Sequence, residues 1–136
     1  MEKRPKILVI DDDRVLQQVI RATLETKNYE VVSAYDGVEG LQKVVEERPD
    51  VIILDVIMPE KHGFEVCKEL KNDPKYYFFS KIPVMMLTVY PDDRQAAHLS
   101  VRDGMEMDAE DYLHKPFESK ELLARVERLL KKRQGK

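Results

Sequence analysis

Short apolar runs alternate with amphipathic segments five times along this chain, and no other feature of the sequence constrains the fold as strongly. The apolar runs lie at residues 6–10, 29–34, 51–54, 83–87 and 112–113, and several are rich in β-branched residues. Each run is followed by a segment with apolar residues at helical spacing, at 13–24, 38–45, 64–70, 92–103 and 122–130. Strands that alternate with helices predict an α/β fold, in which right-handed crossovers cover both faces of a parallel sheet.

Local signals mark where the first helix begins and ends. Asp13 suits the N-cap position, and Asn28 lies where a left-handed residue is expected after the helix. One apolar stripe is predicted to face the core. Its members are Val15, Leu16, Val19, Ile20, Thr23 and Leu24.

Length and composition exclude several classes of protein. The chain has 136 residues, the size of one domain, and we expect a single domain over 1–136 with no output domain. Its net charge of −3 argues against direct binding of nucleic acid or of a membrane surface. One cysteine and three scattered histidines exclude a disulfide scaffold and a Cys/His zinc module. The longest apolar runs are too short for a membrane span, so we expect a cytoplasmic protein.

Polar residues follow the predicted strands at one edge of the sheet, which is where open parallel sheets bind ligands. Asp11 and Asp12 follow the first strand, Asp55 the third, Thr88 the fourth, and Lys115 the fifth. Two carboxylates about 4 Å apart repel by roughly 4 kcal/mol at an effective dielectric of 20. A hard divalent cation bound by oxygen atoms would offset this repulsion. Mg²⁺ fits best, because it accepts few carboxylates and leaves room for phosphoryl oxygens, and Mn²⁺ can substitute.

These residues stand in four motifs that resemble the receiver domain of two-component response regulators. The match runs from residue 6 to about 133, and Asp12, Asp55, Thr88 and Lys115 follow one another at intervals of 43, 33 and 27 residues, close to the family's spacings. The resemblance implies a flavodoxin-like (βα)5 fold with strand order 2-1-3-4-5. The motifs are Ile7-Leu-Val-Ile-Asp-Asp12, Asp55-Val-Ile-Met-Pro59 with Gly63, Pro83-Val-Met-Met-Leu-Thr88, and Asp111-Tyr-Leu-His-Lys-Pro-Phe117.

The resemblance also implies roles for individual residues. Asp55 is similar to the phosphorylated aspartate, Asp12 to a direct Mg²⁺ ligand, and Asp11 to the acid that holds a metal-bound water. The carbonyl oxygen of Ile57 resembles a further metal ligand, and Lys115 the partner of the phosphoryl group. An ionised carboxylate needs no general base to act as a nucleophile, so alignment and charge neutralisation would supply most of the catalysis.

The resemblance further implies a signalling switch rather than an enzyme that acts on other molecules. Thr88 would donate to a phosphoryl oxygen and move inward, and Tyr112 would turn to fill the space. The altered face would comprise the fourth helix, fifth strand and fifth helix. The phosphoryl donor would be a sensor histidine kinase or a histidine phosphotransfer protein, and the downstream target stays open. Asp111, Glu121 and Arg125 resemble part of a dimer network, but Glu127 replaces a basic residue, so we expect a monomer or a weak phosphorylation-dependent dimer.

Other interpretations stay open at this point. Residues 11–16 also fit the signature of haloacid-dehalogenase-type phosphatases, in which Asp11 would be the nucleophile and Asp13 the general acid. A pseudo-receiver that only binds proteins is a further alternative. A flavin binder is disfavoured, because three acids in the first loop would repel its phosphate. Two segments look longer than usual in the family: the aromatic stretch around Tyr76–Phe79, for which packing is favoured over partner binding, and residues 104–110.

Overall fold

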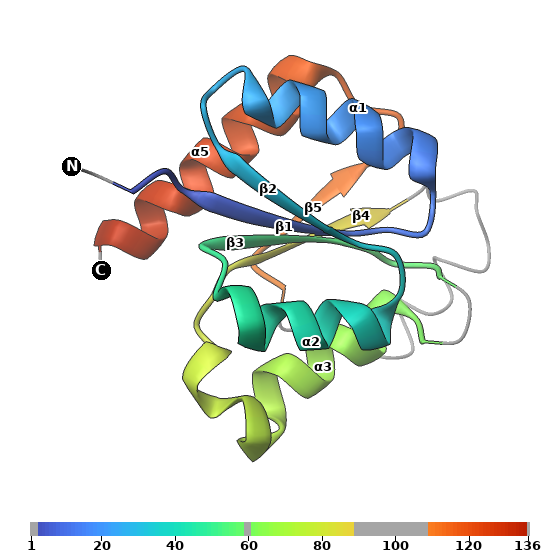
Figure 1. The fold of residues 1–136 in the computed structure, drawn as a ribbon, viewed down its shortest axis with the longest axis vertical. Helices are drawn as coiled ribbons and strands as arrows, with labels where there is room; N and C mark the ends of the chain where they lie inside the picture. Colours follow the sequence, from blue (N-terminus) through green and yellow to red (C-terminus); the bar gives the residue numbers. More distant parts are fainter. Residues whose placement is uncertain (1–2, 59–60, 89–108, 136) are drawn as a thin grey trace.

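A five-stranded parallel sheet forms the centre of the protein, as a computed structural model shows (Figure 1). The structure describes residues 3–58, 61–88 and 109–135. The strand order is β2-β1-β3-β4-β5, which confirms the order predicted from the sequence. The strands are β1 (Lys6–Ile10), β2 (Glu30–Ala34), β3 (Val51–Asp55), β4 (Val84–Thr88) and β5 (Asp111–His114).

Helices cover both faces of this sheet, as the alternating pattern predicts. In Figure 1, α1 and α5 lie on one face, and α2 and α3 lie on the other. The helix predicted over 92–103 lies outside the described residues. Among those that are described, no helix is both long and apolar enough to cross a membrane. The helices are α1 (Arg14–Glu25), α2 (Gly37–Glu47), α3 (Gly63–Asn72), the 3-10 helix η1 (Pro74–Phe79) and α5 (Ser119–Gly135).

The register of the strands brings their carboxyl ends to one edge. Ile10 of β1 pairs with Leu54 of β3, so Asp11 and Asp55 follow at the same level. Asp55 in turn pairs with Leu87, which places Thr88 of β4 one residue further along the same edge. The last four residues of β1 and all of β3 are buried, because helices pack on both sides of them.

The core-facing stripe of α1 differs from the predicted one. Val15 is 71% exposed and Val19 is 50% exposed, whereas Gln17 is buried together with Ile20 and Leu24. The local signals around this helix are confirmed: Asp13 is the N-cap residue, and Asn28 has a φ of 62°. The prediction is confirmed for Leu16, Ile20 and Leu24 and wrong for Val15 and Val19, because the helix turns the amide of Gln17, rather than a valine, toward the end of the sheet.

The aromatic segment after α3 is divided between core and surface. Tyr76 is buried and Phe79 is half-buried against the core, whereas Tyr77 and Phe78 are exposed. A 3-10 helix has three residues per turn, so Tyr76 and Phe79 share a face. The preference for packing is therefore confirmed for two of the four aromatic residues. Most of the predicted extended loop 104–110 lies outside the described part of the chain.

Candidate functional site

Three carboxylates meet at the carboxyl edge of the sheet. Asp11 and Asp12 follow β1, and Asp55 is the last residue of β3. One oxygen from each of the three lies within 4.8 Å of the others. Segments 43 residues apart in the chain are thus brought into one acidic cluster, as the strand order predicts. Such a cluster suits a divalent cation that prefers oxygen ligands.

Asp11 is the most enclosed member of this cluster. It is 1% exposed, and its Oδ1 accepts a hydrogen bond of 2.9 Å from the backbone amide of Asp13. Its Oδ2 receives no hydrogen bond from any described residue and lies 3.7 Å from the ammonium nitrogen of Lys115. Burial raises the pKa of Asp11, while the Asp13 amide and Lys115 act in the opposite direction. A buried anionic oxygen without a hydrogen-bond donor fits the proximity of a bound cation.

Asp55 combines burial with access to a fixed positive charge. The residue is 7% exposed, and its Oδ1 accepts a hydrogen bond of 3.1 Å from Nζ of Lys115. Burial, followed by the nearby charge of Asp11, raises the pKa of Asp55 to about 6, and Lys115 offsets only part of that rise. The carboxylate is still mainly ionised at pH 7, so it can act as a nucleophile without a general base.

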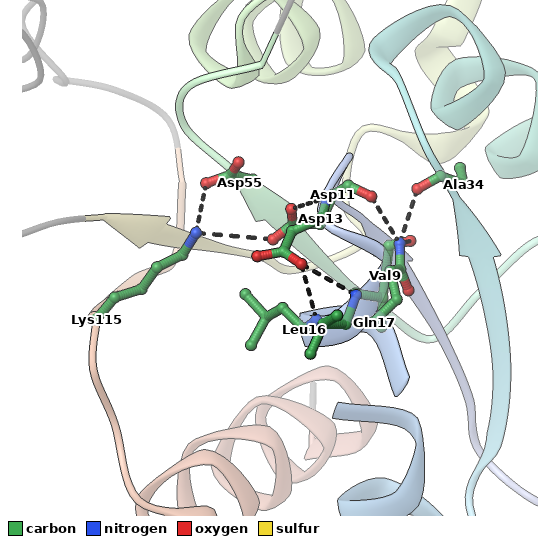
Figure 2. Close-up of polar contacts among 9 residues, drawn as sticks. Val9, Asp11, Asp13, Leu16, Gln17, Ala34, Asp55 and Lys115 are labelled. Carbon is green, nitrogen blue, oxygen red and sulfur yellow. Dashed lines mark hydrogen bonds and ion pairs between the residues drawn. The ribbon is translucent and has the colours of Figure 1, made fainter. Parts of the chain in front are cut away.

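Lys115 reaches the cluster from the residue that follows β5. Its backbone amide donates to the carbonyl of Thr88 with a distance of 2.6 Å, which extends the pairing of β4 and β5 beyond the strand. The side chain then extends toward the two buried acids and lies between Asp11 and Asp55 (Figure 2). The predicted convergence of Lys115 with the acids is confirmed in these contacts.

The loop after β3 is held close to Asp55 by a glycine. The backbone amide of Gly63 donates to the carbonyl of Val56 over 2.8 Å. A Cβ atom at Gly63 would collide with the backbone carbonyl oxygen of Asp55. Glycine is therefore required at the start of α3 for close approach rather than for a special φ. Ile57, whose carbonyl is predicted to be a further metal ligand, is half-buried in this loop.

The N-cap residue of α1 and one residue within that helix organise the loop that carries Asp11 and Asp12. The Asp13 carboxylate accepts hydrogen bonds of 3.0 Å from the amides of Val15 and Leu16. Gln17 was not among the residues predicted from the sequence to be important. Its buried amide nitrogen faces three carbonyl oxygens at 2.9–3.1 Å and so ties the ends of β1 and β2 together, as Figure 2 shows. These oxygens belong to Val9, Asp11 and Ala34.

The two predicted switch residues lie on neighbouring strands beside the acidic cluster. The hydroxyl of Thr88 lies 3.0 Å from Nδ1 of His114. Tyr112 is half-buried and packs against the core on the side of α2 and α3. The switch roles of Thr88 and Tyr112 stay predictions, because they concern a change between two states.

Comparison with known proteins agrees with this geometry. A model of the response regulator receiver domain family matches residues 7–127. The chain belongs to the response regulator receiver family. Response regulator MprA of Mycobacterium ulcerans (strain Agy99) is 39% identical over 127 residues, which are 93% of this chain and 50% of that protein. The DNA-binding dual master transcriptional regulator RpaA of Synechocystis is 38% identical over 128 residues, which are 94% of this chain and 50% of that protein. The chain thus spans about half the length of these relatives.

Solved receiver structures share the fold. The receiver domain of Francisella response regulator 1452 superposes with a TM-score of 0.78 and 31% identity, and 95% of this chain and 98% of that one are covered. Vibrio cholerae chemotaxis protein CheY4 gives a TM-score of 0.73 at 35% identity, with 94% and 100% covered. The receiver fold inferred from the motifs is confirmed.

Proposed function

We propose that this receiver is a signalling switch that accepts a phosphoryl group on Asp55 from a phosphohistidine. A sensor histidine kinase or a histidine phosphotransfer protein is the donor. The observation that carries the proposal is the position of the buried Asp55 carboxylate, at the edge of the sheet and 3.1 Å from Lys115. Family membership supports the same role, because response regulator receivers are the phosphoacceptor domains that the motifs imply.

The acidic cluster would hold Mg²⁺, or Mn²⁺ in its place. Asp12 and Asp55 would supply carboxylate oxygens, Asp11 would hold a metal-bound water, and the carbonyl of Ile57 would be a further ligand. The three acids lie close enough together to serve one ion. The buried Oδ2 of Asp11, which accepts no hydrogen bond from the described residues, and the mutual proximity of the three acids support this fit. When bound, the metal ion would neutralise charge on the carboxylates and on the phosphoryl oxygens.

The chain's own residues supply alignment and one positive charge. An oxygen of Asp55 attacks phosphorus as the phosphorus–nitrogen bond of the phosphohistidine breaks, and the released imidazole retains its electron pair and takes up a proton. Lys115 stays within reach of the phosphoryl oxygens and stabilises their charge during the transfer. Asp55 is itself the group that is modified, so the chain changes its own state and turns over no external substrate.

The output of the switch would be a changed surface. Thr88 would donate to a phosphoryl oxygen, Tyr112 would move toward the space that this vacates, and the face formed by the fourth helix, β5 and α5 would bind a partner in the cytoplasm. Several kcal/mol of difference between the two states is required for a near-complete switch. Within the described chain, Asp111 already pairs with Arg125 at 2.8 Å and with Arg128 at 3.0 Å, which favours a monomer before phosphorylation.

Phosphorylation by a small donor tests the proposal. The protein is incubated with acetyl phosphate and Mg²⁺, and the phosphorylated fraction is measured by intact-mass spectrometry. We expect one added phosphoryl group, which is absent in EDTA and in Asp55→Asn. Glu46→Gln, which changes an exposed acid of α2, is the matched control and should be labelled like the wild type. Undiminished labelling of Asp55→Asn would overturn the assignment.

The geometry disfavours the alternative in which Asp11 is the nucleophile of a phosphatase. That reaction needs Asp13 as a general acid, but the Asp13 carboxylate is occupied as the N-cap of α1. Its Oδ1 accepts from the amides of both Val15 and Leu16, which holds the carboxylate against the first turn of the helix. A pseudo-receiver is disfavoured because the three acids and Lys115 are all present and in contact.

A further inference from the structure

His114 is the cross-strand partner of the predicted switch residue Thr88. The two residues pair directly in the register of β4 and β5, and their side chains lie 3.0 Å apart from Thr88 Oγ1 to His114 Nδ1. Side chains two residues apart in a strand share a face of the sheet. The pair therefore lies on the same face as the preceding pair, Met86 and Tyr112. His114 thus contacts one predicted switch residue and lies beside the other.

The backbone around Thr88 is fixed on both sides. The carbonyl of Leu87 accepts from Val56 of the β3 loop at 3.1 Å, and the carbonyl of Thr88 accepts from Lys115 at 2.6 Å. These bonds hold the end of β4 between its two neighbouring strands. A movement of the Thr88 hydroxyl toward Asp55 is then mainly a rotation of its side chain about χ1, which for threonine has few allowed positions.

A threonine hydroxyl has one proton to donate. When that proton is directed to the imidazole nitrogen of His114, the hydroxyl cannot donate to a phosphoryl oxygen. The same proton is the one that the switch requires in the phosphorylated state. The direction of the Thr88–His114 hydrogen bond depends on the imidazole tautomer. In the tautomer that carries its proton on Nε2, Nδ1 is the acceptor, and the hydrogen bonds to His114 and to the phosphoryl group compete for the Thr88 proton.

We propose that His114 is a positioning residue that holds the Thr88 hydroxyl toward β5 in the unphosphorylated receiver. This hydrogen bond stabilises the unphosphorylated state. Part of the free energy gained when Thr88 binds the phosphoryl group is therefore used to break it. This inference rests on the proposed phosphorylation of Asp55. It assigns control over the threshold of the switch to His114, which adjoins the site lysine and contacts the Thr88 hydroxyl.

Binding of beryllofluoride with Mg²⁺, measured by calorimetry, tests the inference in the intact chain, since BeF₃⁻ mimics a phosphoryl group on a carboxylate. His114→Leu removes the competing acceptor, and we expect it to bind about threefold to tenfold more tightly than the wild type, the range for one net hydrogen bond. His114→Asn, whose amide atoms lie near the position of ring Nδ1, should bind like the wild type. In a Thr88→Val background, the change of His114 to Leu should have no effect.

The outcomes separate the inference from the proposed function. Tighter binding that depends on Thr88, together with a change in the ¹⁵N shift of His114 Nδ1 when BeF₃⁻ binds, supports it. Weaker binding by His114→Leu, or the same gain in the Thr88→Val background, overturns it while phosphorylation at Asp55 stands. Absence of BeF₃⁻ binding by the wild type would overturn both. His114→Ala serves as a second variant if the leucine variant does not fold.

Discussion

The ammonium nitrogen of Lys115 lies 3.1 Å from Asp55 Oδ1 and 3.7 Å from Asp11 Oδ2. One cation thus faces two buried carboxylates that come from different strands. A single positive charge only partly offsets them, since the pKa values of both acids stay raised. Because the negative charge is only partly offset, we expect a second, divalent cation at the site. Such a cation would also allow a ligand with negatively charged oxygen atoms to bind there.

Removal of the Lys115 charge should slow phosphorylation. Lys115→Met takes away a charge-assisted hydrogen bond, of roughly 1.5–3 kcal/mol, that the phosphoryl group would use during transfer. We expect the rate of phosphorylation by acetyl phosphate to fall by about tenfold to a hundredfold. Lys120→Met, at an exposed position early in α5, is the control and should keep the wild-type rate. Equal rates for Lys115→Met and wild type would contradict the role of this lysine.

Asp55 should destabilise the metal-free protein at neutral pH. Its folded pKa of about 6 lies above the ordinary value of 3.8, so the folded state binds the proton more tightly than the unfolded state does. The stability that comes from this group is complete below pH 3.8 and is lost as the pH rises through 6. In EDTA at pH 7.5, Asp55→Asn should therefore be more stable than wild type by up to about 3 kcal/mol.

Urea denaturation between pH 4 and pH 7.5 measures this difference. The stabilisation by Asp55→Asn should disappear near pH 4, and Mg²⁺ should reduce it at pH 7.5, because only the wild type has the third carboxylate. Asp36→Asn, which lies outside the acidic cluster and keeps a side-chain oxygen at the N-cap of α2, is the matched control and should not be stabilised at pH 7.5. A lower stability of Asp55→Asn at pH 7.5 would contradict the electrostatic account.

Gly63 should be required for the geometry of the site. An alanine there would push against the backbone carbonyl of Asp55, which cannot move without disturbing the end of β3. We expect Gly63→Ala to lose about 2–4 kcal/mol of stability and also to lose phosphorylation. Gly40→Ala is a suitable comparison, since the three atoms nearest to its Cβ would all belong to the side chain of Ile10 rather than to the backbone. That variant should lose stability while it retains the rate of phosphorylation in its folded fraction.

Gln17 should contribute strongly to stability, although it is polar. Gln17→Met would remove both N–H donors of the side chain from the carbonyl oxygens at the ends of β1 and β2. The carbonyl of Ala34 would keep its hydrogen bond from the Asp11 amide, but a buried group left unsatisfied costs about 1–3 kcal/mol. We expect a loss of about 2–4 kcal/mol in the free energy of unfolding, measured in urea. The adjacent Gln18 is exposed, so Gln18→Met should change stability by less than about 0.5 kcal/mol. Similar effects of the two substitutions would show that the amide of Gln17 is not important.

The sequence predicted features that depend on local chemistry or on the ends of strands. Asp13 and Asn28 follow from capping preferences, and the meeting of Asp11, Asp55 and Lys115 follows from parallel strands that end at one edge. Gln17 could not be found in this way, because its partners lie on two strands and their carbonyl oxygens are present in every sequence.

The same limit applies to residues whose role depends on register or on the rotation of a helix. The contact of His114 with Thr88 requires the pairing of β4 with β5, which hydrophobic periodicity does not supply. Val15 and Val19 fit the apolar period of α1, yet both are exposed. A polar residue next to them takes the inward position, since the end of the sheet needs a hydrogen-bond donor there.

Identification of the aspartate that becomes acylated tests the central claim most directly. The protein is treated with acetyl phosphate and Mg²⁺, reduced with borohydride so that an aspartyl phosphate becomes homoserine, and digested for peptide mass spectrometry. The account predicts homoserine at position 55, with Asp11 and Asp12 unchanged. Homoserine at position 11, or at neither position, would contradict it.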